Sequence, residues 1–219
     1  MPRLRADFEF QVHAYNGVND MLPKLPKRLG AVKHYIQPSH RIVVVRAEDR
    51  KNCQTPKRQI EAIARKAGSR PKGKHGPFEV LTRIAIEELE AWFFGDVPAL
   101  VEAYPGVSPS IDKQRGFRNP DAIAGGTWEA MERMLQRAGH YPAGLAKTDF
   151  ARRMAACMDA SRNTSKSFQV FRDGILVYEV RLIVTRLQLS RSLLRARRRR
   201  RAVGVRDVRR GRLRSPCLR

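Results

Sequence analysis

Carboxylates follow two apolar stretches of this 219-residue chain, at positions where they could bind a metal ion. The first stretch is RIVVVRAED (41–49) and the second is RIAIEELEAWFFGD (83–96). In open α/β sheets, ligands bind beyond the carboxyl ends of the strands. Carboxylate oxygens placed there can hold Mg²⁺, and two such ions can activate water and stabilise the leaving oxygen of a phosphodiester. The acids concerned are Glu48, Asp49, Glu87, Glu88 and Glu90.

Each of these acids also has a structural interpretation. Glu48 and Asp49 could form a solvated strand end or a helix cap. If a helix follows RIAI, the acids that open it are stabilised by the positive end of the helix dipole. Leu89, Trp92 and Phe93 have helical spacing that suits core packing. We therefore keep both interpretations, with the acids grouped at the mouth of a site or serving only the fold.

Two further segments carry basic residues that could contact phosphate. The loop SRPKGKHGP (69–77) contains Lys72 and Lys74, and RNTSKSFQVF (162–171) contains Arg162 and Lys166. Basic and hydroxyl groups bind the phosphate backbone, and an aromatic ring can stack on a base. We predict nucleic-acid contacts at these four residues. The alternatives are a solvated loop for the first segment and, for the second, an ordinary strand or loop whose phenylalanines enter the core.

The elements that would position these residues alternate between strand and helix. Short alternating or apolar runs predict strands at 8–15, 41–49 and 78–86. Ile42 to Val45 are four successive apolar β-branched residues, which favours a strand buried on both faces. Helices are predicted at 55–68, 87–96, 127–139 and 149–160. This order indicates an α/β domain with a mainly parallel sheet, followed by a helical and irregular portion.

Composition limits the class of protein. An apolar content of 42% is enough for a packed core. No apolar run approaches the length of a membrane span, and the N-terminus lacks the apolar stretch of a secretory signal. The three cysteines form no CxxC pair and the five histidines are scattered, so zinc is not indicated. A cytoplasmic protein without a membrane partner is expected.

The net charge of +23 is distributed unevenly. Residues 176–219 hold 15 arginines, no lysine and two acids. This tail lacks caps, glycine stops and a steady period, and its composition is typical of a GC-rich gene translated in the wrong frame. We predict a disordered or frameshifted tail without selected function. A functional RNA- or DNA-binding arm is the alternative.

Four segments together carry a family resemblance. They are RIVVVRAEDRKNC (41–53), RIAIEELEAWFFGD (83–96), FRNPDAIAGGTWE (117–129) and RNTSKSFQVFRDGI (162–175). The chain resembles the bacterial domain-of-unknown-function family 4276, which is similar to Toprim-like proteins. Such domains bind a divalent metal with a glutamate after the first strand and an Asp-x-Asp after a later one. This chain lacks the expected first strand with its VEGxTE-type loop, and Ala47 replaces the first aspartate, so only Asp49 stands in register.

The resemblance implies a three-layer Toprim/Rossmann-like α/β sheet with a mainly helical C-terminal portion. The expected divisions are 1–96, 97–175 and the tail 176–219. It also implies a Mg²⁺-dependent nuclease or phosphoryl-transfer component of phage defence, with Asp49 and Glu88 catalytic. The metal ligands would be Glu48, Asp49, Glu88 and Glu90. Two alternatives stay open: a non-catalytic nucleic-acid-binding protein or partner of an ATPase, and an inactive copy that folds poorly.

Overall fold

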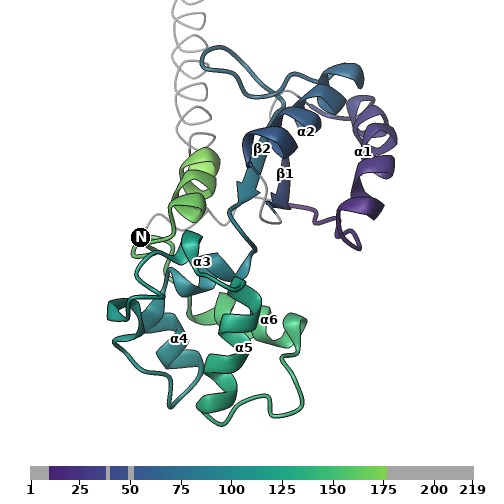
Figure 1. Ribbon diagram of the computed structural model, residues 1–219. Helices are drawn as coiled ribbons and strands as arrows, with labels where there is room; N and C mark the ends of the chain where they lie inside the picture. Colours follow the sequence, from purple (N-terminus) through teal and green to yellow (C-terminus); the bar gives the residue numbers. More distant parts are fainter. Residues whose placement is uncertain (1–9, 38–39, 49–51, 177–219) are drawn as a thin grey trace, which may run out of the picture. The chain divides into compact units, whose positions relative to one another are not determined.

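The computed structural model describes residues 10–37, 40–48 and 52–176 (Figure 1). These residues belong to one compact unit that ends at Gly174, with only the first two residues of a second unit described. No helix among them is long and apolar enough to cross a membrane. Asp49 and almost all of the tail predicted from residue 176 lie outside the described residues.

The α/β region, residues 10–85, contains two parallel strands and two helices (Figure 1). Strand β1 (Ile42–Ala47) pairs with β2 (Val80–Ala85), and the pairing runs in register from one end to the other. Helix α1 (Val18–Lys33) precedes β1, and α2 (Gln54–Lys66) connects the two strands. A two-stranded sheet is only marginally stable by itself, so it depends on the helices that pack against it. That packing forms one apolar cluster, whose buried members are Met21, Leu25, Leu29, Val44, Ile60, Ala64 and Val80.

The prediction that β1 is buried on both faces is wrong. Val44 is buried against the helices, but Val43 and Val45 on the opposite face are 38% and 39% exposed. Successive side chains of a strand point to opposite faces, so helices on one face leave the alternate residues uncovered. The apolar run predicted a strand correctly, but it could not indicate how large the sheet is.

The strand predicted at 8–15 is also absent wherever the structure describes that segment. Residues 10–15 form no strand, and Phe10 and Val12 are 81% and 76% exposed. An alternating pattern becomes a strand only where a partner supplies hydrogen bonds, and β1 pairs only with β2 among the described residues. The fold is therefore confirmed as mixed α/β with a small parallel sheet. A larger three-layer sheet of Toprim or Rossmann type does not appear in the described part of the chain.

Several helix boundaries agree with the sequence pattern. Gly68 and Gly139, predicted to end helices, have φ angles of 76° and 83°. The first follows α2, and the second follows α5 (Thr127–Arg137). Such left-handed angles suit glycine and allow the chain to leave a helix. The predicted start of α2 was less accurate, because the helix begins at Gln54 with Cys53 as its N-cap.

The helical region, residues 88–174, has its own apolar core (Figure 1). It comprises α3 (Glu90–Phe94), α4 (Val97–Ala103), α5 and α6 (Lys147–Cys157), with the short 3₁₀ turns η1 (Ile111–Lys113) and η2 (Pro120–Ala122). Its fully buried large side chains include Tyr104, Met131, Leu135, Phe150 and Met154. Residues 166–176 are helical, whereas we expected a strand or loop there. Ser165 explains the helix start, because its Oγ accepts a hydrogen bond from the Phe168 N–H at 3.1 Å.

Candidate functional site

Glu48 lies directly after β1 and extends the strand pairing by one residue. Its N–H donates to the Ala85 carbonyl at 2.9 Å, and its side chain is 9% exposed. Its carboxylate oxygen Oε2 lies 3.4 Å from the backbone nitrogen of Glu87, which donates to it. The structure thus brings a buried carboxylate to the carboxyl end of the parallel strands, where α/β proteins bind ligands. The prediction for Asp49 stays untested, since that residue is not described.

The backbone turns sharply at Glu87. Its φ angle is 58°, in the left-handed region that a residue with a side chain rarely adopts. Such a conformation costs about 1–3 kcal/mol and persists only where the surroundings hold it. This turn follows the end of β2 at Ala85 and leads the chain into the helical region.

Glu88 caps the helix α5. Its Oε2 accepts a hydrogen bond from the Thr127 hydroxyl at 3.0 Å and another from the Trp128 N–H at 2.8 Å. A carboxylate at this position satisfies a free backbone donor and interacts favourably with the helix dipole. Glu88, which was predicted to be catalytic, therefore has a structural role in this arrangement. Its hydrogen bonds join the segment 83–96 to the segment 117–129.

Glu90 is a buried carboxylate with a raised pKa. Burial raises the pKa of Glu90, and the neighbouring carboxylates of Glu88 and Glu129 raise it further, although a backbone hydrogen bond and the Lys147 ammonium act in the opposite direction. The side chain is 8% exposed. A buried carboxyl that holds its proton more tightly than usual is common at functional sites, and also occurs in structural networks.

These acids do not assemble a metal centre in the part of the chain that the structure describes. No group of three or more His, Cys, Asp or Glu side chains there could hold a metal ion. Glu88 is committed to α5, and the raised pKa of Glu90 opposes the ionised form that a metal needs. The described residues therefore do not fit Mg²⁺ by themselves.

The residues between 162 and 167, where phosphate contacts were predicted, bind the rest of the helical region instead. The Arg162 Nε donates to Oδ1 of the fully buried Asp96 at 2.6 Å, and this pairing raises the pKa of the guanidinium. Asp96 also accepts the backbone N–H groups of Ala99 at 3.2 Å and Asp159 at 2.7 Å. Lys166 is exposed. Of the two predicted cations, Lys166 is the one that faces solvent without an ion pair to another described residue.

Asn163 explains why a glycine stands in the phrase WFFGD. Its Nδ2 donates to the Trp92 carbonyl at 2.6 Å, and its Oδ1 accepts the Ser165 N–H at 2.9 Å. A Cβ placed on Gly95 would lie 2.1 Å from that Oδ1. The close approach of the two segments therefore requires glycine at position 95.

Asp121 links the segment 117–129 to the segment 162–175 through hydrogen bonds. Its two carboxylate oxygens accept hydrogen bonds from the Ser165 hydroxyl at 2.8 Å and from both the hydroxyl and the N–H of Ser167, at 2.8 and 2.9 Å. The Ser167 hydroxyl also accepts from the Trp92 indole N–H at 2.7 Å, and Phe171 stacks on that indole with a centroid separation of 4.8 Å. We call this the interlock: Gly95, Asp96, Asp121, Arg162, Asn163, Ser165 and Ser167. Apart from Arg162, the interlock residues were not predicted from the sequence, because polar residues far apart in sequence give no periodic signal.

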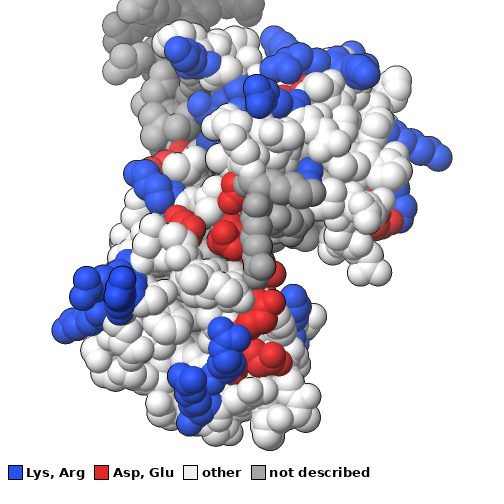
Figure 2. Space-filling view, in the orientation of Figure 1, with Lys and Arg blue, Asp and Glu red and all other residues white. Residues whose placement is uncertain are grey.

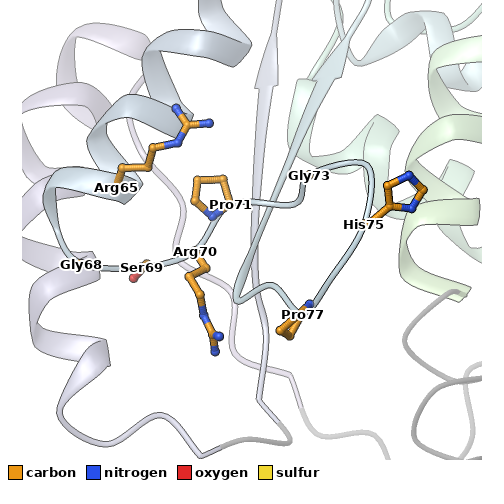
Figure 3. Close-up of a pocket in the computed structure, with 8 residues that line it drawn as sticks. All are labelled: Arg65, Gly68, Ser69, Arg70, Pro71, Gly73, His75 and Pro77. Atoms are coloured by element: carbon orange, nitrogen blue, oxygen red, sulfur yellow. The ribbon is translucent and has the colours of Figure 1, made fainter.

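The basic loop 69–77 surrounds a shallow hollow of about 490 Å³ (Figure 3). Its lining includes Arg65, Arg70 and His75, and the three side chains point in different directions from its rim. Arg70 pairs with Glu79 at 3.2 Å, and the Lys72 ammonium lies 5.4 Å from the centroid of the Phe78 ring. Lys74 is exposed. In Figure 2, blue side chains gather over this end of the α/β region.

Taken together, these features define a mixed α/β protein with a strand-end carboxylate, an exposed basic loop and a helical region held by a buried polar interlock. Comparison with family models adds the particular family. The chain belongs to the family described as "Domain of unknown function (DUF4276)", whose model matches residues 10–176. No curated protein and no solved structure matches the chain.

Proposed function

We propose that this protein binds nucleic acid, with the loop 69–77 contacting the phosphate backbone. The observation that carries the proposal is the concentration of basic side chains around the hollow: the exposed Arg65, Arg70, Lys74 and His75, together with the half-buried Lys72. A strongly basic surface attracts polyanions and supplies most of the sequence-independent affinity for nucleic acid.

The arrangement favours an extended polyanion over a single bound phosphate. A site for one phosphate needs donors that converge on one point, as bidentate arginines do. The side chains of Arg65, Arg70 and His75 diverge instead (Figure 3). Diverging cations reach successive phosphates along a backbone, which is how positioning contacts to nucleic acid are made.

The test uses the full chain and a labelled DNA duplex of random sequence, with affinity measured by fluorescence anisotropy over a range of salt concentrations. Each phosphate contact contributes about 0.9 to the slope of log K against log [salt]. The double variant Lys72→Gln/Lys74→Gln should lower that slope by about 2. The matched control, Lys24→Gln/Lys27→Gln on α1, removes the same charge and should leave the slope close to that of the wild type. Equal slopes for both variants would contradict a role for the loop.

A second candidate function is metal-dependent phosphodiester chemistry at the strand ends. The observation in its favour is the buried Glu48 carboxylate, which meets the strained turn at Glu87 beyond the parallel strands. Asp49, the next residue, would have to complete any metal site, because the described residues do not form one. A role in phage defence would follow from the resemblance and is likewise a proposal, whereas an ATPase partner belongs to the non-catalytic alternative.

Calorimetric titration with Mg²⁺ and with Mn²⁺ tests this candidate without assuming activity. Binding by the wild type that is lost in Asp49→Asn and Glu48→Gln would support it, and nuclease assays with the same variants would then be informative. Absence of metal binding in the wild type would exclude the second candidate and leave the first unaffected.

A further inference from the structure

We propose that a second loop, Lys113–Arg118 in the helical region, is a further contact site for the phosphate backbone of nucleic acid. This inference rests on the proposed nucleic-acid binding and assigns a second surface to it. The segment KQRGFR holds three cations in six residues, and Asp112 immediately before it is the one acid beside them. Lys113, Arg115 and Arg118 are all exposed.

The loop is held in place from both ends and from within. Ile111 before it is buried, and the ring of Phe117 packs against Phe94 with centroids 5.4 Å apart. Backbone hydrogen bonds close successive turns, from Gln114 N–H to the Ile111 carbonyl at 3.1 Å and from Phe117 N–H to the Gln114 carbonyl at 2.9 Å. A binding surface that is ordered beforehand loses less entropy when it meets its ligand.

The charged side chains of Lys113, Arg115 and Arg118 contribute little to holding the loop in place. Neither Lys113 nor Arg115 makes an ion pair with another described residue, and the side chain of Arg118 reaches only the Lys113 carbonyl, at 3.2 Å through its Nε. Apolar contacts and backbone bonds thus hold a turn whose charges are free to meet a ligand. By contrast, Arg162 in the same region is paired with the buried Asp96.

Hydroxyl groups adjoin the loop and add to its suitability for phosphate. Ser108 and Ser110 precede η1, and their hydroxyls lie 3.2 Å from one another. Serine hydroxyls, lysine and arginine are among the groups that most often contact the nucleic-acid backbone. The ring of Phe117 packs inward, so the loop offers charges and hydroxyl groups to the phosphate backbone, and contacts to the backbone carry no sequence information.

The experiment again uses the full chain, the labelled duplex and a salt titration. The variant Lys113→Gln/Arg115→Gln should lower the slope of log K against log [salt] by about 2, so its affinity should fall furthest below that of the wild type at low salt. Its control, Arg133→Gln/Arg137→Gln on α5, removes the same charge from the same region. The control slope should stay near that of the wild type. Because neither the Lys113 nor the Arg115 side chain makes an ion pair with another described residue, the thermal midpoint should change little. Adding Arg118→Gln as a third substitution should lower the slope once more.

The outcomes separate this inference from the proposed function. If the wild type binds, Lys72→Gln/Lys74→Gln weakens binding and the 113/115 variant behaves like its control, then the second site is wrong while the first stands. If both loop variants lower the slope, both sites are supported. If the wild-type chain does not bind the duplex at low salt, the proposed function itself fails.

Discussion

The helical region turns the carboxylates of Asp96 and Asp121 inward, where backbone N–H groups, hydroxyls and Arg162 meet them. The α/β region leaves the cations of loop 69–77 at the surface, around a shallow hollow. The interlock therefore uses its polar residues to hold the chain together, and the basic loop 69–77 presents them to solvent. The difference separates residues that fix the fold from residues that are available to a ligand.

This comparison changes how the four family-like motifs are interpreted. Glu88 joins the second motif to the third by capping α5, and Asp121 joins the third to the fourth through Ser165 and Ser167. Buried hydrogen-bonded networks specify one arrangement strongly, because every unpaired member is costly. The distinctive sequence of these motifs therefore has a physical explanation in packing. Substitutions in the interlock should affect stability first, and substitutions of cations in the basic loops should affect binding more than stability.

The largest decrease in the free energy of unfolding is expected from Asp96→Ala. It removes a fully buried carboxylate and leaves the Arg162 guanidinium and the N–H groups of Ala99 and Asp159 without their acceptor. The Arg162 side chain is 39% exposed and can be solvated, so most of the loss should come from the two N–H groups, each of which costs about 1–3 kcal/mol when left buried without an acceptor. Urea denaturation followed by circular dichroism would measure the loss. As a control, Asp173→Ala removes a carboxylate that is 61% exposed and pairs only with its neighbour Arg172, so the change should stay within about 0.5 kcal/mol.

If the two aspartate variants were equally stable, Asp96 would not hold the region together. The hydrogen bonds of the interlock would then result from the fold without stabilising it. DNA affinity of the folded Asp96→Ala protein provides the other half of the comparison. It should match the wild type when measured well below the unfolding transition, because no basic-loop residue contacts Asp96.

A smaller decrease in the free energy of unfolding is expected from Gly95→Ala. The added methyl would lie 2.1 Å from Asn163 Oδ1 and 2.8 Å from the Ser165 nitrogen, so the two segments would have to separate. Overpacking of this kind typically costs about 1–3 kcal/mol. Gly30→Ala in α1 is the matched control, since its Cβ would meet nothing within 4 Å. Alanine favours the helix there, so Gly30→Ala should raise the free energy of unfolding by up to about 1 kcal/mol. Opposite changes in the free energy of unfolding for the two glycine variants would sharpen the comparison. An unchanged free energy of unfolding for Gly95→Ala would contradict it.

The sequence predicted local elements better than their assembly. Periodicity and glycine stops located α2, α5 and both strands, because those signals depend on neighbouring residues. The exposed Val43 and Val45 were mispredicted since burial on a second face depends on distant parts of the chain. A structural role for Glu88 was one of two interpretations, but its capping of α5 could not be predicted, because its partners lie about forty positions away at Thr127 and Trp128. Sequence pattern thus suggested which residues could do chemistry, and tertiary contacts decided which are committed elsewhere.

The smallest change in stability is expected at Glu90, and it depends on pH. Its raised pKa means that the folded state holds this proton more tightly than the unfolded chain does. The protein therefore loses stability as the pH rises from the ordinary glutamate value through the raised pKa, and the loss is complete above it. Glu90→Gln keeps the shape of the protonated side chain without the charge. It should be more stable than the wild type at neutral pH, and this advantage should disappear as the pH falls below the ordinary glutamate pKa. Thermal midpoints of both proteins across that pH range would show it, and an advantage that is independent of pH would assign the effect to packing.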